Sequence, residues 1–189
     1  MNIGIDVDGV IFDTENWMHA YAELFDIDEV GAGVSHPQEV LIEKMYDWSK
    51  ETFDVFVDKY GYFSQKNAPI MPCAEYVINW LREQGHKLII ITARGKWGEI
   101  EKSITEEMFK KYNLKFDEIC YYAFDKATVC KEHNIDYMID DAPNNIDRLD
   151  SAGVKCLYLR GVNRKKIDSP NVSEVSNWGE IYRFFKELK

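Results

Sequence analysis

Residues 2–10 read N-I-G-I-D-V-D-G-V, and the rest of the chain is organised around them. The apolar start of this stretch predicts a buried strand, and two aspartates separated by one residue follow directly. Because side chains at i and i+2 lie on the same face of a strand, Asp6 and Asp8 are expected to leave the strand together. Two such carboxylates repel each other by about 4 kcal/mol at an effective dielectric constant of about 20. The pair therefore indicates a bound cation, a shared proton or a reaction, with a simple Asp-Gly turn as the alternative.

Length and composition bound the class of protein. The 189 residues suffice for one domain with a small insert, and a hydrophobic content of 46% can supply a substantial core. The formal net charge of -10 at pH 7 argues against nucleic acid or an anionic membrane as a partner. No stretch has the pattern of a signal peptide or a membrane span. We expect a cytoplasmic protein with reduced core cysteines, because no metal-ligand spacing relates Cys73, Cys120, Cys130 and Cys156.

Residues 14–71 show no strand pattern and predict a helical insert after the first strand. Apolar residues between positions 17 and 24 fall at helical spacing, residues 26–37 look like a loop, and a second helical segment follows. The insert is rich in aromatic residues, most of which we expect in its own core. The predicted organisation is a core of residues 1–13 and 72–189 with a small helical cap between them.

From residue 72 onward, helical and strand patterns alternate. Apolar runs typical of buried parallel strands lie at residues 87–92, 116–122, 136–140 and 154–159, the last strand expected. Such alternation predicts right-handed βαβ units in a parallel sheet. Asn177 and Glu180 predict the cap of a final helix. Ligands of these sheets bind beyond the carboxyl ends of the strands, which makes the polar residues at those ends the candidate site.

Six polar residues at the predicted strand ends are expected to meet there: Asp6, Asp8, Thr92, Lys126, Asp140 and Asp141. One ammonium group does not balance four carboxylates, so a divalent cation is expected, and all-oxygen ligands favour Mg²⁺. A phosphate held by the metal, Lys126 and Thr92 completes the charge balance. This clamp suits phosphoryl transfer, with Asp6 as the nucleophile and Asp8 as the general acid and base.

The motifs D-x-D-G-V, apolar-T-A-R, a lysine and I-D-D occur here in the order found in the haloacid dehalogenase superfamily, which the whole core resembles. The resemblance implies a Rossmann-like α/β fold, with a parallel sheet in the order 3-2-1-4-5 flanked by helices. It also implies a Mg²⁺-dependent mechanism through an aspartyl-phosphate. The true dehalogenases lack the second aspartate, so Asp8 indicates phosphate chemistry.

Residue roles follow from the resemblance as further expectations. Asp6 is implied to be both nucleophile and metal ligand. Asp8 is implied to be the acid and base, and to bind the metal through its backbone carbonyl. Thr92 and Lys126 are implied to bind phosphate. Asp140 is implied to bind the metal. Asp141 is implied either to bind the metal directly or to hold one of its ligands in place.

Within the superfamily, V-D-G-V-I, I-T-A-R and I-D-D-A-P resemble the cytosolic deoxyribonucleotidase group of 5′-nucleotidases. This finer resemblance implies a nucleoside monophosphate as substrate. Phe12, close after the nucleophile, and Trp17, in the insert, are candidates to contact it, since an aromatic ring can stack on a base. Arg94, in the loop after the T-A motif, is expected to contact phosphate or the cap, or to be solvated.

Other functions stay open. A phosphatase or mutase of sugar phosphates needs the same chemistry. A response-regulator receiver also combines clustered aspartates with a threonine and a lysine, but here the acidic pair shares the first strand and an insert follows it, which favours an enzyme. The basic run at residues 164–166 is interpreted as a solvated loop. A homodimer is an open alternative to a monomer.

Overall fold

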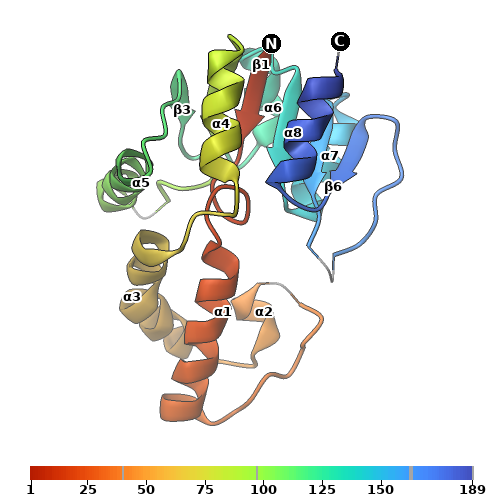
Figure 1. Cartoon of the computed structure of the whole chain (residues 1–189). Helices are drawn as coiled ribbons and strands as arrows, with labels where there is room; N and C mark the ends of the chain where they lie inside the picture. The colour runs from red at the N-terminus through yellow and green to blue at the C-terminus, as the bar shows by residue number, and fades with distance from the viewer. Residues whose placement is uncertain (40, 97, 162–163, 189) are drawn as a thin grey trace. The chain divides into compact units, whose positions relative to one another are not determined.

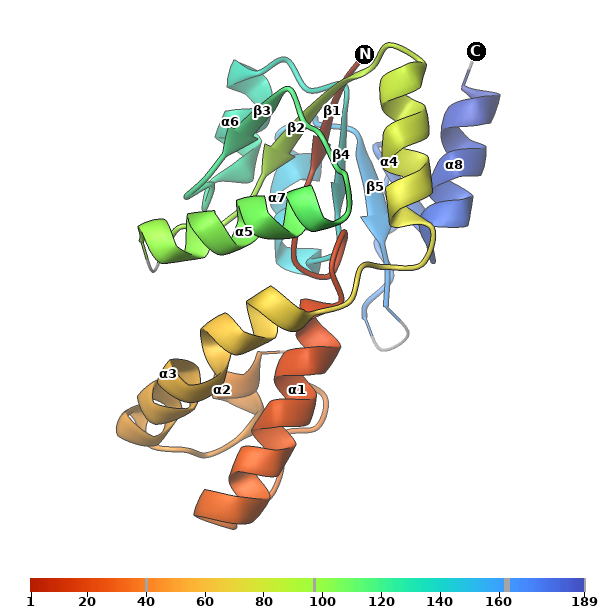
Figure 2. The same ribbon diagram turned by 60° about the vertical axis from the view of Figure 1, so that its left-hand side comes forward.

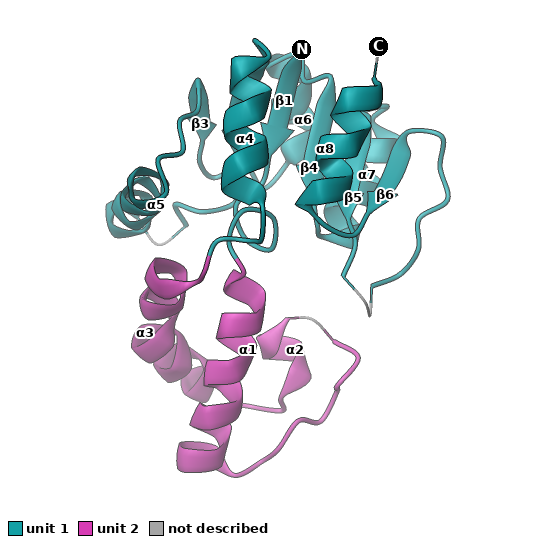
Figure 3. Ribbon diagram, viewed as in Figure 1, with its two compact units in different colours: residues 1–12, 70–189 teal, residues 13–69 magenta. Residues whose placement is uncertain are grey.

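The computed structural model describes residues 1–39, 41–96, 98–161 and 164–188. The chain divides into two compact units, Met1–Phe12 with Ile70–Lys189, and Asp13–Pro69 (Figure 3). The insert expected at residues 14–71 starts one residue after the second unit and ends two residues beyond it. Each unit has its own core.

A six-stranded parallel sheet lies at the centre of the first unit, in the order β3-β2-β1-β4-β5-β6. The strands are β1 (Asn2–Ile5), β2 (Lys87–Ile91), β3 (Glu118–Cys120), β4 (Tyr137–Asp140), β5 (Cys156–Leu159) and β6 (Val172–Val175). The predicted Rossmann-like α/β fold and the order of its first five strands are confirmed. The expectation that the strand near residue 159 is the last one is wrong. In β6 only Val175 is buried, so this edge strand lacks the apolar run that reveals the others.

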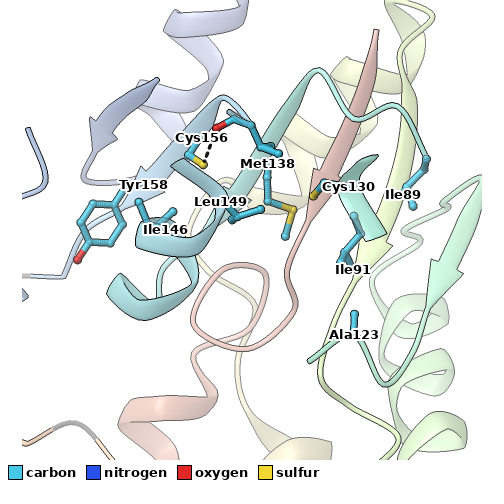
Figure 4. Close-up of a cluster of buried hydrophobic side chains, with 10 residues drawn as sticks. Ile89, Ile91, Ala123, Cys130, Met138, Ile146, Leu149, Cys156 and Tyr158 are labelled. Carbon is cyan, nitrogen blue, oxygen red and sulfur yellow. Dashed lines mark hydrogen bonds between the residues drawn. The ribbon is translucent and has the colours of Figure 1, made fainter. Parts of the chain in front are cut away.

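Helices cover both faces of this sheet. On one face, α4 (Ala74–Glu83) packs against α8 (Trp178–Glu187), and α5 (Glu99–Lys111) lies on the same side (Figures 1 and 2). On the other face, α6 (Lys126–Glu132) packs beside α7 (Pro143–Ser151). Figure 4 shows the core between this second pair and the sheet, which includes Ile89, Ile91, Cys130, Met138, Ile146, Leu149, Cys156 and Tyr158.

The start of α8 helps to fix the chain just after the first strand. Asn177 accepts a hydrogen bond from the backbone N–H of Glu180 at 3.0 Å, which confirms the predicted cap. The indole of Trp178, the first residue of the helix, is 1% exposed and donates to the carbonyl of Val10 at 2.7 Å. This buried hydrogen bond ties the loop after Asp8 to the body of the unit.

The second unit is helical. It contains α1 (Thr14–Phe25), a π-helical turn (Asp26–Val30), α2 (Ile42–Met45) and α3 (Lys50–Asn67). Its core consists mostly of aromatic side chains from these helices and the segments between them, namely Phe25, Tyr46 and Phe56, with Trp48, Phe53 and Tyr60 packed against them.

Two expectations for the second unit are corrected. The loop expected from residue 26 begins instead with the π-helical turn, which ends where Gly31 adopts a φ of 73°. The single helical segment expected near residues 41–60 is two helices. Tyr46 and Ser49, which lie between these helices, both have extended backbone, and Ser49 caps α3 by accepting from the N–H of Thr52 at 3.2 Å.

All four cysteines are free thiols. Cys130 and Cys156 are buried and Cys120 is partly buried, as expected for core residues, but Cys73 is exposed. Burial raises the pKa of Cys130 to about 12, so this thiol stays protonated at neutral pH. Among the described residues, no helix combines the length and apolar character that crossing a membrane requires.

Candidate active site

Three predicted site residues meet at the carboxyl edge of the sheet. Asp6 directly follows β1, Asp140 ends β4, and Lys126 is the first residue of α6. The ammonium of Lys126 lies 2.7 Å from Oδ2 of Asp6 and 2.6 Å from Oδ2 of Asp140. All three residues are buried, and Asp140 is 0% exposed. A buried lysine therefore bridges the carboxylates of two neighbouring strands.

Burial and neighbouring charges shift the pKa values of this cluster. Burial raises the pKa of Asp6 to about 6; Lys126 opposes the shift, and Asp140 adds to it by like-charge repulsion. Burial alone would lower the pKa of Lys126, but the two carboxylates outweigh it and raise that pKa above its usual value. Lys126 is therefore a permanent cation beside a carboxylate that ionises near neutral pH.

Asp140 is further held by the segment that starts α7. Its Oδ1 accepts from the backbone N–H of Ala142 at 2.9 Å. The side-chain amide of Asn145 lies 3.1 Å from both carboxylate oxygens of Asp140. Asn145 was not among the predicted site residues. The signal available in the sequence was its place in the first turn of the helix that follows I-D-D.

Asp141 lies against the turn at Gly9. A Cβ on Gly9 would be 2.1 Å from Oδ2 of Asp141, and Gly9 has a φ of +72°. Arg164 also contacts Asp141: its Nη1 is 2.9 Å from Oδ2 and also donates to the backbone carbonyl of Asp141. The side chain of Arg164 is 9% exposed, so the expectation that it is solvated is wrong. Lys165, next along the chain, is half-exposed and pairs with Asp147.

Arg94 forms a two-pronged ion pair with Asp8. Its Nε lies 2.8 Å from Oδ2 of Asp8, and its Nη2 lies 2.6 Å from Oδ1. Arg94 is 2% exposed, which contradicts the alternative that it is solvated. Thr92 is also buried, and its hydroxyl oxygen accepts from the backbone N–H of Arg94 at 3.2 Å. The strand end at Thr92 and the acidic pair are thus linked through Arg94.

The donor set fits a hard divalent cation. Asp6, Asp140 and Asp141 are buried and each offers a carboxylate oxygen, with these atoms within 4.8 Å of one another. Carboxylate oxygens are the ligands that Mg²⁺ prefers. Lys126 is not the single cation expected, however, because Arg94 and Arg164 join it at the site. The case for a metal therefore rests on the three grouped carboxylates and not on an excess of negative charge.

Comparison with known proteins assigns the chain to a protein family. A family model described as "5′ nucleotidase, deoxy (Pyrimidine), cytosolic type C protein" matches residues 1–188. The chain belongs to this 5′-nucleotidase family. A curated nucleotidase from Clostridium acetobutylicum is 26% identical over 191 residues, covering 100% of this chain and 95% of that protein. Family membership confirms that the chain is a hydrolase and favours the enzyme over the receiver alternative.

Solved structures share the fold of this chain. A haloacid dehalogenase-like hydrolase, SP0104 from Streptococcus pneumoniae, has a TM-score of 0.70 and 16% identity, covering 97% of both chains. A predicted phosphatase from Clostridium acetobutylicum has a TM-score of 0.69 and 16% identity, covering 99% of this chain and 98% of that one. The recognised resemblance to haloacid dehalogenase-like hydrolases is thereby confirmed.

The aromatic residues expected to contact substrate have different surroundings. Phe12 is 0% exposed, and its ring centroid lies 6.1 Å from that of Phe109 and 5.8 Å from that of Tyr112. These are the contacts of a core residue, so the structure does not support the expectation that Phe12 lines a pocket. Trp17 lies in the second unit, partly buried, with its ring 5.9 Å from that of Tyr21. A substrate contact by Trp17 stays a prediction.

The close approach of Gly9 to Asp141 yields a stability prediction. Gly9→Ala is expected to destabilise the protein by more than about 1–2 kcal/mol, which is the cost of a left-handed alanine, because the methyl group also displaces Asp141. Urea unfolding measures the change. Gly153→Ala is the matched control, since Gly153 has a φ of +77° and no atom within 4 Å of its ideal Cβ. Equal losses in both variants would show that the contact with Asp141 has no energetic consequence.

Proposed function

We propose that this member of the 5′-nucleotidase family hydrolyses (deoxy)nucleoside monophosphates with Mg²⁺, through an aspartyl-phosphate formed on Asp6. The observation that supports this most is the buried cluster of Asp6, Asp140 and Asp141 beside Lys126, in a chain of this family. The cluster unites a nucleophile, an oxygen-rich cation site and a fixed positive charge. Phosphoryl transfer requires these parts in one place.

In the first half-reaction, a carboxylate oxygen of Asp6 attacks the phosphorus of the ester. The bond between phosphorus and the ester oxygen breaks, and the carboxyl group of Asp8 gives its proton to that oxygen, which leaves as the hydroxyl of the nucleoside. Lys126 and Thr92 bind the phosphate oxygens. When bound by Asp6, Asp140 and Asp141, Mg²⁺ supplies further neutralisation of the phosphate charge.

In the second half-reaction, water attacks the phosphorus of the acyl phosphate and gives its proton to the carboxylate of Asp8. The bond between phosphorus and Asp6 breaks, which releases inorganic phosphate. Asp6 is again a carboxylate and Asp8 is again protonated, so the enzyme returns to its starting state. The raised pKa of Lys126 keeps its ammonium charged throughout this cycle.

Mg²⁺ is expected to be required for activity and to raise the melting temperature. Binding to the folded state alone stabilises a protein by about 2.7 kcal/mol at a ligand concentration of 100 Kd. The melting temperature with Mg²⁺ and with EDTA, measured beside hydrolysis of nitrophenyl phosphate, checks both effects. Asp140→Asn should lose the Mg²⁺-dependent shift, while the exposed control Asp58→Asn should keep it. Full activity in excess EDTA would contradict the metal assignment.

A panel of phosphate monoesters tests the substrate class. The family description and the nucleotidase relative support a nucleotide, with a pyrimidine deoxynucleotide as first choice. We expect kcat/KM for some nucleoside monophosphate to exceed that for sugar phosphates by at least about tenfold, or about 1.4 kcal/mol of transition-state binding. If sugar phosphates are the better substrates, the nucleotide assignment fails and the phosphatase chemistry remains.

An aromatic side chain of the second unit is proposed to stack on the base, which is worth about 1–3 kcal/mol per base. Trp17→Ala should then lower kcat/KM for the nucleotide more than for nitrophenyl phosphate. Tyr76→Ala is the matched control, because Tyr76 is an exposed aromatic residue on α4.

We also propose a cytoplasmic location, which the word cytosolic in the family description and the free thiols support.

A further inference from the structure

We propose that Arg94 is a positioning residue that fixes the carboxylate of Asp8 for its two proton transfers. The inference rests on the proposed function, in which Asp8 is the general acid and base. The observation behind it is the two-pronged ion pair between the two side chains, with distances of 2.8 Å and 2.6 Å. A fork of this kind sets the plane of a carboxylate as well as its distance, which a single point charge does not do.

The guanidinium of Arg94 also has a hydrogen-bond partner in α5. Its Nη1 donates to the hydroxyl oxygen of Thr105 at 3.0 Å, and that hydroxyl donates to the backbone carbonyl of Glu101 at 2.8 Å. Thr105 is 0% exposed and lies in α5, so the chain of hydrogen bonds ends on helical backbone. Buried networks whose members are all satisfied restrict motion strongly. Arg94 therefore transmits the position of α5 to Asp8.

The backbone around Arg94 is fixed at three points. Its N–H donates to the hydroxyl of Thr92 at 3.2 Å, and its carbonyl accepts from the N–H of Tyr122 at 2.9 Å. The next residue, Gly95, donates its N–H to Oε2 of Glu101 at 2.6 Å. The loop thus has partners directly after β2, in α5 and after β3. This arrangement suits a rigid support for a reacting group.

The fork by itself does not occupy every lone-pair site of Asp8. A carboxylate offers about four lone-pair sites on its two oxygens, and the two N–H groups of Arg94 take one on each oxygen. Direct phosphate binding by Arg94 is the competing role. That role predicts a higher KM for every phosphate ester and weaker inhibition by inorganic phosphate when Arg94 is replaced.

Two substrates of similar size separate the roles. Benzyl phosphate has an alkoxide leaving group that needs a proton, whereas 4-nitrophenyl phosphate largely does not. In Asp8→Asn, kcat/KM for benzyl phosphate should fall by about 10²–10⁴-fold, the usual contribution of general acid–base catalysis. In Arg94→Met it should fall by about 10–10²-fold, as expected for a misplaced group. For 4-nitrophenyl phosphate, Arg94→Met should stay within about threefold of the wild type.

The double variant gives the decisive comparison. If Arg94 acts through Asp8, Asp8→Asn combined with Arg94→Met should match Asp8→Asn alone within about threefold, because residues that act as a unit are not additive. Multiplied losses, or equal losses on both substrates, overturn the proposal. A uniform rise in KM assigns Arg94 to phosphate binding instead and overturns it as well.

Two further variants guard against misfolding, with circular dichroism as the folding check. Thr105→Val removes the support of the guanidinium while keeping a similar volume, and should show a smaller loss confined to benzyl phosphate. Arg94→Lys keeps the charge but not the fork, so it should restore only part of the activity. The exposed Arg82→Met is the control and should behave as wild type. If Asp8→Asn itself spares benzyl phosphate, the acid role in the proposed function fails; if only the Arg94 and Thr105 variants spare it, this inference alone fails.

Discussion

Asp6→Asn is expected to abolish phosphate ester hydrolysis while the protein stays folded. An amide cannot form the acyl phosphate, and it is a poorer ligand for a divalent cation. The fold should survive because the substitution removes a carboxylate that is unfavourable in the folded protein: burial raises the pKa of Asp6 to about 6. The same change also removes the repulsion between Asp6 and Asp140. Residual activity within about tenfold of wild type, a barrier change of only about 1.4 kcal/mol, would exclude Asp6 from the mechanism.

Trapping the covalent intermediate sharpens this test. Wild-type enzyme quenched with acid during turnover should carry one phosphoryl group on the peptide that contains Asp6, and Asp6→Asn should carry none. Asp8→Asn should still accumulate the adduct with 4-nitrophenyl phosphate, since that leaving group needs little protonation and the loss of the base slows release. Asp58→Asn, on the surface of the second unit, is the charge-matched control. If the wild-type enzyme carried the phosphoryl group on another residue, that residue and not Asp6 would be the nucleophile.

Lys126→Met is expected to cost both stability and activity. The ammonium of Lys126 lies 2.7 Å and 2.6 Å from two buried carboxylates, which lose their shared partner in the variant. Removing one member of a buried ion pair typically costs about 3–5 kcal/mol. Urea unfolding in EDTA measures the loss without the influence of a metal. Lys50→Met is the control: its ion pair with Asp54 is exposed, and such pairs contribute little.

The loss in Lys126→Met should depend on pH. Asp6 has a folded-state pKa raised to about 6 even with the lysine present, against 3.8 for the unfolded chain, and removing the cation raises the folded value further. A raised carboxyl pKa contributes stability that is present below the unfolded value and is lost as the pH rises through the folded value. The variant should therefore be closer to wild type at pH 5 than at pH 8. An equal deficit at both values would contradict the charge-based explanation.

Much of the fold and part of the site could be predicted because both depend on local patterns. Strands β1, β2 and β4 are buried on both faces of a parallel sheet, so they appear in the sequence as continuous apolar runs. The rule that parallel strands present their carboxyl ends at one edge then brings together residues far apart in the chain. Asp6, Lys126 and Asp140 meet for this reason, with the ammonium of Lys126 2.7 Å from Asp6 and 2.6 Å from Asp140.

No local sequence pattern predicts which residues of different loops pair with each other. Arg94 and Asp8 are 86 positions apart, and Arg164 and Asp141 are 23 apart. Whether an arginine in a loop is solvated or buried against an aspartate depends on where several loops end in space. Phe12 shows the same limit, because only the packing of Phe109 and Tyr112 decides that it is core.

Sequence patterns were sufficient to predict the alternation of strands and helices and the residues that leave the sheet at its carboxyl edge, because backbone periodicity and the handedness of βαβ units act on short stretches. Three features become visible only in the folded chain: the half-exposed edge strand β6, the support of Asp140 by Asn145, and the two arginine–aspartate pairs. These features depend on contacts between segments that have no fixed spacing along the chain. Their energies come from burial and from hydrogen-bond geometry, which exist only once the segments have met.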